Sequence, residues 1–115
     1  MKRDYTNDKR FLAMIPEDAS LNCRAVCAVL FTIDSFHQEE ALLAIPLEVL
    51  QAINTTVKML TPIDYEHVGY FIALGSGLYN PNNDTPVVLH RLGLGVIKRL
   101  TNTLAAKLMA TIPKH

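Results

Sequence analysis

The fold is decided by residues 86–110, PVVLHRLGLGVIKRLTNTLAAKLMA. One side of a helical wheel drawn for this stretch carries a row of apolar residues, Leu89, Val96, Leu100 and Leu104. Pro86 suits the first helical position, because a helix needs no N–H there. Gly93 and Gly95 oppose a helix, at about 1 kcal/mol each relative to alanine. The apolar row favours one C-terminal helix, with a bend at the two glycines.

The residues just before this helix allow two interpretations. Residues 75–77, GSG, interrupt the helical pattern, and a run of asparagine, proline and aspartate typical of turns follows. In the first interpretation, residues 70–79 and 87–94 are the strands of a hairpin. In the second, a helix and a long turn precede the C-terminal helix, with Asp84 or Thr85 as its N-cap. The apolar row favours the second interpretation and leaves the first open.

The clearest helix upstream is residues 46–60, which a proline again opens. One face of this segment is apolar and consists of Leu47, Leu50, Ile53, Val57 and Leu60. Glu48 lies in the first turn and Lys58 in the last, and both charges complement the helix dipole. These features predict an amphipathic helix that buries one face.

Capping signals mark two further helices. Thr61 or Asp64 can cap a helix over residues 65–74. Residues 35–38, SFHQ, have the spacing of a capping box and predict a short helix through Ile45.

The N-terminal part of the chain predicts a helix that needs cover on every side. Residues 16–18, PED, open this helix, and every residue from 25 to 31 is apolar. Because a chain of this size has few elements to enclose such a helix, a subunit interface is its natural cover. A buried strand over residues 24–33 is the alternative. We expect the dimer interface to consist of Val26, Val29, Leu30, Ile33, Leu50, Ile53 and Val57.

Length and composition restrict the class of protein. The 115 residues are enough for one domain, 50% are hydrophobic, and 11 Lys and Arg balance 11 Asp and Glu. This composition excludes a disordered segment and a uniformly basic nucleic-acid coat. We expect a single domain with four parts: a flexible arm (1–15), a helical dimerisation core (16–74), a turn (75–85) and the C-terminal helix (86–112).

The same features set an expectation for the compartment. The longest apolar run is far shorter than the ~20 residues that span a bilayer, and no cleavable signal is apparent. The chain has only two cysteines and no other sign of a cross-link, which is typical of a cytosolic protein that keeps its thiols reduced. A cytoplasmic protein without membrane contact is therefore expected.

No catalytic constellation is apparent, so no enzyme activity and no cofactor are predicted. Cys23 and Cys27 lie four residues apart and share a helix face, and His37 or His67 is available to complete a metal site. Two thiols without a second Cys/His pair at a characteristic distance are a weak metal signal. Small buried hydrophobes are the better interpretation of both cysteines, and no metal ligand is predicted.

A polar stripe lies opposite the apolar row of the C-terminal helix. It contains Arg91, Lys98 and Asn102, with Arg99 beside it. Arginine and asparagine can contact guanine and adenine edges, and lysine reaches phosphates. A helix that carries such residues behind a turn and another helix has the layout of a major-groove reader. An ordinary solvated helix face is the competing interpretation.

Several segments resemble FlhD, the smaller subunit of the bacterial flagellar master activator. Residues 46–52, PLEVLQA, follow residues 38–43, QEEALL, and are similar to the family's Leu-Pro-x-x-Val-x-x-Ala helix after paired glutamates. Residues 89–90, LH, an apolar stretch and residues 99–102, RLTN, are similar to the family's Ile-His, apolar stretch and Arg-Leu-Leu-Asn. The likeness covers about residues 30–104.

The resemblance implies an all-α fold with an intertwined homodimer core and a helix-turn-helix-like C-terminal region. It also implies a DNA-binding transcriptional activator subunit. Such a subunit acts with a larger, zinc-binding FlhC-type partner on promoter DNA and recruits RNA polymerase. Related pairs are encoded on conjugative elements. The DNA-binding residues expected from the stripe and the resemblance together are His90, Arg91, Lys98, Arg99 and Asn102.

A second function class fits the composition. Zero net charge and the high apolar content are also typical of a small dimeric protein–protein interaction module, such as an adaptor or inhibitor without nucleic-acid contact.

Overall fold

The computed structural model describes residues 9–33 and 42–111, and all regular structure in these ranges is helical. The helices follow one another as α1 (Lys9–Ala13), α2 (Leu21–Phe31), α4 (Leu47–Lys58), α5 (Pro62–Gly75) and α6 (Pro86–Thr111). The all-α prediction is confirmed. The alternative strand over residues 24–33 and the alternative hairpin over residues 70–94 are both wrong. Within the described residues, no helix combines the length and the apolar character that a membrane crossing requires.

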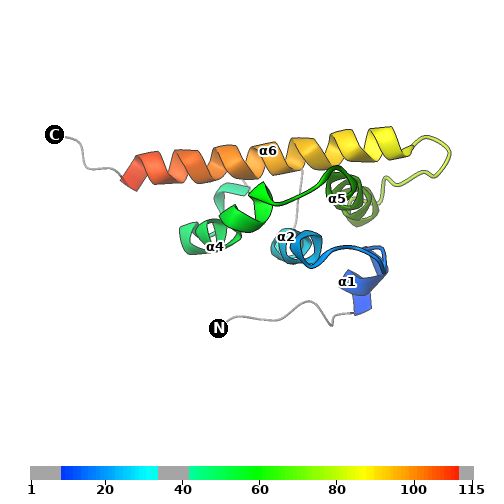
Figure 1. The fold of residues 1–115 in the computed structure, drawn as a ribbon, viewed down its shortest axis with the longest axis horizontal. Helices are drawn as coiled ribbons and strands as arrows, with labels where there is room; N and C mark the ends of the chain where they lie inside the picture. The colour runs from blue at the N-terminus through cyan, green and yellow to red at the C-terminus, as the bar shows by residue number, and fades with distance from the viewer. Residues whose placement is uncertain (1–8, 34–41, 112–115) are drawn as a thin grey trace.

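The helices lie in layers (Figure 1). The long helix α6 lies along one side, with α5 and α4 beneath its two halves and α2 beneath those two. Both α2 and α6 contact α4 as well as α5, so α4 and α5 form the middle layer. The largest fully buried side chains fill the spaces between the layers and include Phe11, Leu30, Leu42, Leu50, Phe71, Ile72 and Leu100.

The helices α5 and α6 are antiparallel and approach each other at two glycines. A Cβ atom on Gly69 would collide with the backbone of Leu89, and one on Gly93 would collide with the backbone carbonyl of Tyr65. One turn of α5 leads from Tyr65 to Gly69, and the residues opposite them on α6 change from Gly93 to Leu89, one turn back along the chain. The two helices therefore run in opposite directions. Gly93 therefore permits backbone-to-backbone packing, which offsets its unfavourable helix propensity.

Gly95 has no such role, because a Cβ atom there would meet nothing within 4 Å. The helix α6 continues through both glycines without interruption.

Residues 76–85 reverse the chain between α5 and α6, as the second interpretation of the sequence predicts. Gly77 has a φ of +72°, a left-handed conformation that favours glycine. The backbone N–H of Asn80 donates to the carboxylate of Asp84 at 2.7 Å. The hydroxyl oxygen of Thr85 accepts a hydrogen bond from the N–H of Val88 at 3.3 Å, which makes Thr85 the N-cap of α6.

The predicted start of the second helix at residues 16–18 is wrong. The helix α2 begins at Leu21, because the hydroxyl oxygen of Ser20 accepts a hydrogen bond from the N–H of Cys23 at 3.0 Å and caps the helix. The guanidinium of Arg24 donates to the carbonyl groups of Pro16, Glu17 and Ala19. These bonds hold the preceding residues as a turn against the first turn of α2.

The expectation of a flexible arm over residues 1–15 is wrong for the part that the structure describes. Phe11 of α1 is fully buried. Its ring meets the ring of Phe31 edge-on, with centroids 5.5 Å apart, and that of Phe71 at 5.8 Å. The neighbouring Lys9 and Arg10 remain exposed, so the ring is buried without burial of their charges. Residues 1–8, and most of the short helix predicted after residues 35–38, lie outside the described residues.

The helix α4 confirms the prediction for residues 46–60 closely. Pro46 is its N-cap residue, and Glu48 and Lys58 lie in its first and last turns. Its buried face packs against the C-terminal half of α6, where Leu50, Ile53, Val57, Leu100 and Leu104 lie together. The ammonium group of Lys107 donates to the backbone carbonyl of Ile45, which ties α6 to the residue before Pro46.

Candidate functional site

Four of the five predicted DNA-binding residues lie on the part of α6 that is not used for packing. Arg91, Lys98, Arg99 and Asn102 are exposed, whereas Leu100 on the opposite face is buried. Among the residues that the structure describes, no hydrogen bond or ion pair engages the three cationic side chains. Their charges are therefore available to a partner outside the chain.

Three of these residues share one narrow stripe. Lys98 and Asn102 follow Arg91 by seven and eleven positions, so the three side chains lie within about 40° of one another around the helix axis. They span about 17 Å along it. Arg99 lies to one side of this stripe. The prediction that Arg91, Lys98 and Asn102 face the same way is consistent with this spacing and with their exposure.

His90 does not belong to the stripe. Its imidazole ring packs edge-on against the ring of Tyr65 on α5, with centroids 5.5 Å apart. The ring is only partly exposed. His90 therefore contributes to the contact between α5 and α6, and its side chain is directed away from the outer face that carries Arg91.

Sequence reasoning missed one cation close to the stripe. An open depression between α4, α5 and α6 is lined by residues that include Lys58, Tyr65, Lys98 and Asn102. Lys58 is exposed, so it adds a positive charge beside Lys98. The sequence assigned Lys58 only the role of complementing the helix dipole of α4. Lys58 and Lys98 are forty positions apart, so no local pattern could show that they lie near each other.

The residues predicted for a dimer interface lie mostly inside this one chain. Val26 and Leu30 are fully buried, and three members from α4 are also buried, namely Leu50, Ile53 and Val57. Val29 and Ile33 pack against the core and remain partly exposed. Only these last two retain surface that a second copy can cover. Dimerisation itself stays a prediction.

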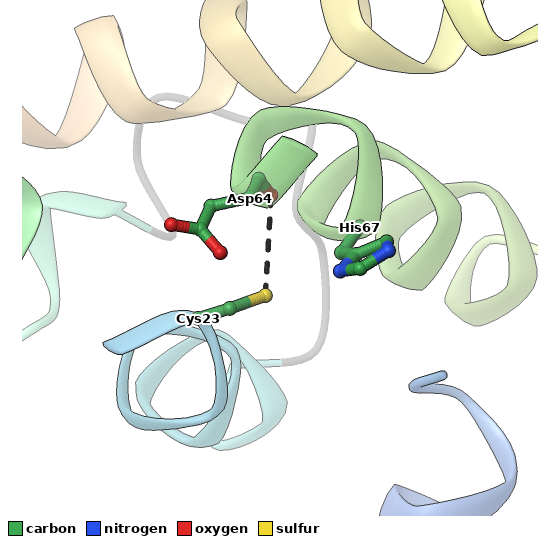
Figure 2. Close-up of side chains that lie close together, drawn as sticks. All are labelled: Cys23, Asp64 and His67. Atoms are coloured by element: carbon green, nitrogen blue, oxygen red, sulfur yellow. Dashed lines mark hydrogen bonds between the residues drawn. The ribbon is translucent and has the colours of Figure 1, made fainter. Parts of the chain in front are cut away.

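A second group of chemically capable residues lies between α2 and α5 (Figure 2). Cys23, Asp64 and His67 offer ligand atoms that all lie within 4.8 Å of one another. The Cys23 thiol donates to the backbone carbonyl of Asp64 at 3.9 Å, and its sulfur lies 4.0 Å from that of Cys27. Figure 2 shows the His67 ring beside the two other side chains, on the same helix as Asp64.

Hydrogen bonds keep the carboxylate of Asp64 ionised. It accepts from the hydroxyl of Ser20 at 2.7 Å, from the backbone N–H of Thr61 at 2.8 Å and from the hydroxyl of Thr61 at 3.0 Å. Burial alone raises the pKa of Asp64, but the hydrogen bonds from Thr61 and Ser20 outweigh burial and bring the pKa below its ordinary value. Asp64 therefore carries a negative charge within the core at neutral pH.

The thiols and the imidazole of this group have different environments. Both cysteines are fully buried and free. Burial, together with the neighbouring Cys23 thiol, raises the pKa of Cys27 well above its ordinary value. The Nδ1 atom of His67 is buried and has no hydrogen-bond partner among the described residues. A buried polar atom without a partner is costly, at about 1–3 kcal/mol.

The sequence contains two pairs of possible metal ligands that a search for characteristic metal-binding spacings does not find. Cys23 and Cys27 are four residues apart on one helix, and Asp64 and His67 are three apart on another, so each pair shares a helix face. More than thirty residues separate the two pairs. Asp64 was identified as a helix cap only, and the prediction of no metal ligand rested on the cysteine spacing.

Comparisons of this chain with family models, curated proteins and solved structures found no match.

Proposed function

We propose that this chain is a DNA-binding subunit of a transcriptional activator, which acts with a larger FlhC-type partner on promoter DNA and recruits RNA polymerase. The observation that carries the proposal is the exposed stripe of Arg91, Lys98 and Asn102 on the outer face of α6. The resemblance to FlhD in the segments around Pro46 and His90 gives the proposal its partner and its setting.

The chemistry of the stripe suits a duplex. A length of about 17 Å covers roughly five base pairs of axis rise, enough for one groove contact. Arg91 and Asn102 supply the side-chain types that make bidentate contacts to bases, and Lys98, with Lys58 nearby, supplies charge for phosphates. Zero net charge restricts the number of such contacts, which fits a subunit that binds DNA as part of a larger assembly.

We infer that the outer face of α6, rather than a compact helix-turn-helix, meets the DNA. The connection between α5 and α6, residues 76–85, is longer than the three to four residues typical of the DNA-binding motif. The antiparallel contact through Gly69 and Gly93 makes α5 a rigid support for α6. A homodimer would present two such faces to a promoter.

The test is an electrophoretic shift of promoter DNA with the partner subunit present. Arg91→Ala combined with Lys98→Ala should weaken binding at least about tenfold and reduce the salt slope by about one unit for each phosphate that is no longer neutralised. Lys9→Ala removes an exposed charge from α1 and serves as the control with unchanged binding. Binding that the double variant leaves intact would remove this site assignment.

One observation favours the interaction module as a second candidate function. Ile63 and Val87, which are 51% and 67% exposed, line an open depression together with Pro62, Pro86 and His90. Exposed apolar side chains beside one another are typical of protein contacts. A purified complex with a protein partner that never retains DNA, even at low salt, would favour this candidate over the first.

A further inference from the structure

We infer that Cys23, Asp64 and His67, with Cys27 as the fourth ligand, form a binding site for a divalent transition metal of the zinc class between α2 and α5. The site lies in the core, away from the outer face of α6. It therefore stands independently of the proposed DNA binding.

The donor set and its placement fit zinc. Thiolate, imidazole and carboxylate are the ligands that Zn²⁺ takes in proteins, usually four in a tetrahedron. Bonds of 2.0–2.3 Å place neighbouring ligand atoms about 3.3–3.8 Å apart. The sulfur atoms of Cys23 and Cys27 are 4.0 Å apart, and the ligand atoms of Cys23, Asp64 and His67 lie within 4.8 Å. Side-chain rotations that bring the ligand atoms of Cys23, Asp64 and His67 inward by about 1 Å reach this spacing, and the Cys27 sulfur lies beside that of Cys23.

The unpartnered nitrogen of His67 points independently to a ligand. Its Nδ1 atom is buried and accepts or donates no hydrogen bond among the described residues. Buried polar atoms are satisfied in almost all native structures, so each exception needs an explanation. Coordination of a metal by this nitrogen satisfies it, and the ring lies next to Cys23 and Asp64 (Figure 2).

The residues around Asp64 already hold its carboxylate in place. Ser20 and Thr61 donate hydrogen bonds to both of its oxygens, at 2.7–3.0 Å. Carboxylates that bind metals are oriented by such partners, which reduce the side-chain entropy cost of binding. The Asp64 side chain is therefore preorganised, whereas the two thiols and the imidazole supply the remaining bonds.

Metal binding must release protons, because the ligand form of cysteine is the thiolate. One Zn²⁺ replaces the protons of Cys23 and Cys27 and binds neutral His67 and ionised Asp64, so two protons leave to solvent. The cluster carries one negative charge after binding. The metal joins α2 to α5, in the core next to the ends of both helices.

The first experiment titrates the metal-free full chain with Co²⁺ alone and then with Zn²⁺ alone. We expect one Co²⁺ per chain, with the absorption bands of tetrahedral cobalt and of thiolate-to-cobalt charge transfer, and full displacement by Zn²⁺. Calorimetry in two buffers of different ionisation enthalpy should count about two released protons. The apparent affinity should then fall about a hundredfold for each unit by which the pH is lowered, because two protons compete with the metal for the thiolates. A folded chain that gives no such bands would overturn the inference.

Two variants separate coordination from folding. His67→Gln removes a partly exposed ligand and should weaken Zn²⁺ binding about a hundredfold while circular dichroism shows the helices intact. Glu66→Gln on the same helix lines the depression with Ile63 and should bind Zn²⁺ like the natural chain. Equal Zn²⁺ affinity in His67→Gln and in the natural chain would contradict the site. In the natural chain, bound Zn²⁺ should also slow alkylation of both thiols by at least about tenfold, and unprotected thiols would count against it.

Discussion

Asp64 connects the first turns of two helices. Its carboxylate accepts hydrogen bonds from Ser20, the N-cap residue of α2, and from Thr61, the N-cap residue of α5. We expect Asp64→Asn to lower the free energy of unfolding at pH 7 by about 1–3 kcal/mol. Three hydrogen-bond donors point at the two carboxylate oxygens of Asp64, and asparagine replaces one oxygen with an NH2 group that cannot accept a hydrogen bond. Urea unfolding followed by circular dichroism measures the difference.

The pH dependence of that difference follows from the lowered pKa of Asp64. An aspartate in the unfolded chain has a pKa of about 3.9, and in the folded chain its pKa lies below that value. The stabilisation is therefore fully present above about pH 4 and is lost as the pH falls through the folded pKa. The natural chain and Asp64→Asn should differ less at pH 3 than at pH 7. An equal difference at both pH values would contradict an ionised, hydrogen-bonded Asp64.

Local spacing explains which residues were predictable. Thr61 and Asp64 lie three positions apart, and the sequence offered one or the other as the cap of the helix that became α5. Ser20 donates to Asp64 across forty-four positions, and no local pattern reports such a contact. Phe11 was hidden in the same way, since its partners Phe31 and Phe71 are distant in sequence.

Gly93 and Gly95 differ in their surroundings although they are two positions apart on α6. A Cβ atom on Gly93 meets the backbone of Tyr65, whereas one on Gly95 meets open space. Gly93→Ala should lower the free energy of unfolding by about 1–3 kcal/mol, because α5 and α6 must separate. Gly95→Ala should raise it by about 0.5–1 kcal/mol through helix propensity.

The pair of glycine variants is its own control, since both make the same chemical change in one helix. Thermal and urea unfolding of the two proteins measure the signs. A neutral Gly93→Ala would mean that α5 and α6 are not in backbone contact, and a destabilising Gly95→Ala would mean that a group outside the described residues packs there.

At the scale of helices, periodicity predicted α4 and α6 because each has one apolar row. The sequence counted Gly93 as unfavourable for α6 and predicted a bend there, because helix propensity describes a residue in an isolated helix and not the backbone opposite it. The start of α2 was misplaced for a related reason. A proline and two acids are a helix-start signal, but the cap at Ser20 and the contacts of Arg24 decided the boundary.

The state of association is the prediction that belongs to the whole molecule. We expect light scattering after size exclusion to give twice the 12.8 kDa of one chain at micromolar concentration. Val29→Lys places a charge on one of the two predicted interface residues that retain exposed surface, and it should shift the chain toward the monomer. Ala25→Lys, at an exposed position of the same helix, is the control for helix stability. A monomer at this concentration would contradict the dimer.

The sequence predicted a subunit interface because every residue from 25 to 31 is apolar. Val26 and Leu30 are buried within the chain instead, because α4 and α5 both pack against α2. The helix α2 does need burial on several faces, as the sequence predicted, but one sequence does not reveal which distant elements bury it. The same limit applies to the cluster of Cys23, Asp64 and His67, which forms only when α5 packs on α2.

The glycine contact between α5 and α6 has a mechanical consequence. Side chains at an ordinary helix interface can rotate and absorb a small displacement. At Gly69 and Gly93 the two backbones are in direct contact, so no side chain lies between them to adjust. A force that tilts or slides α5 therefore carries α6 along as a single rigid lever. A ligand that displaces α5 from its inner side would therefore also displace Arg91 and Lys98 on the outer face of α6. This coupling would act through steric contact between the two backbones and not through charge.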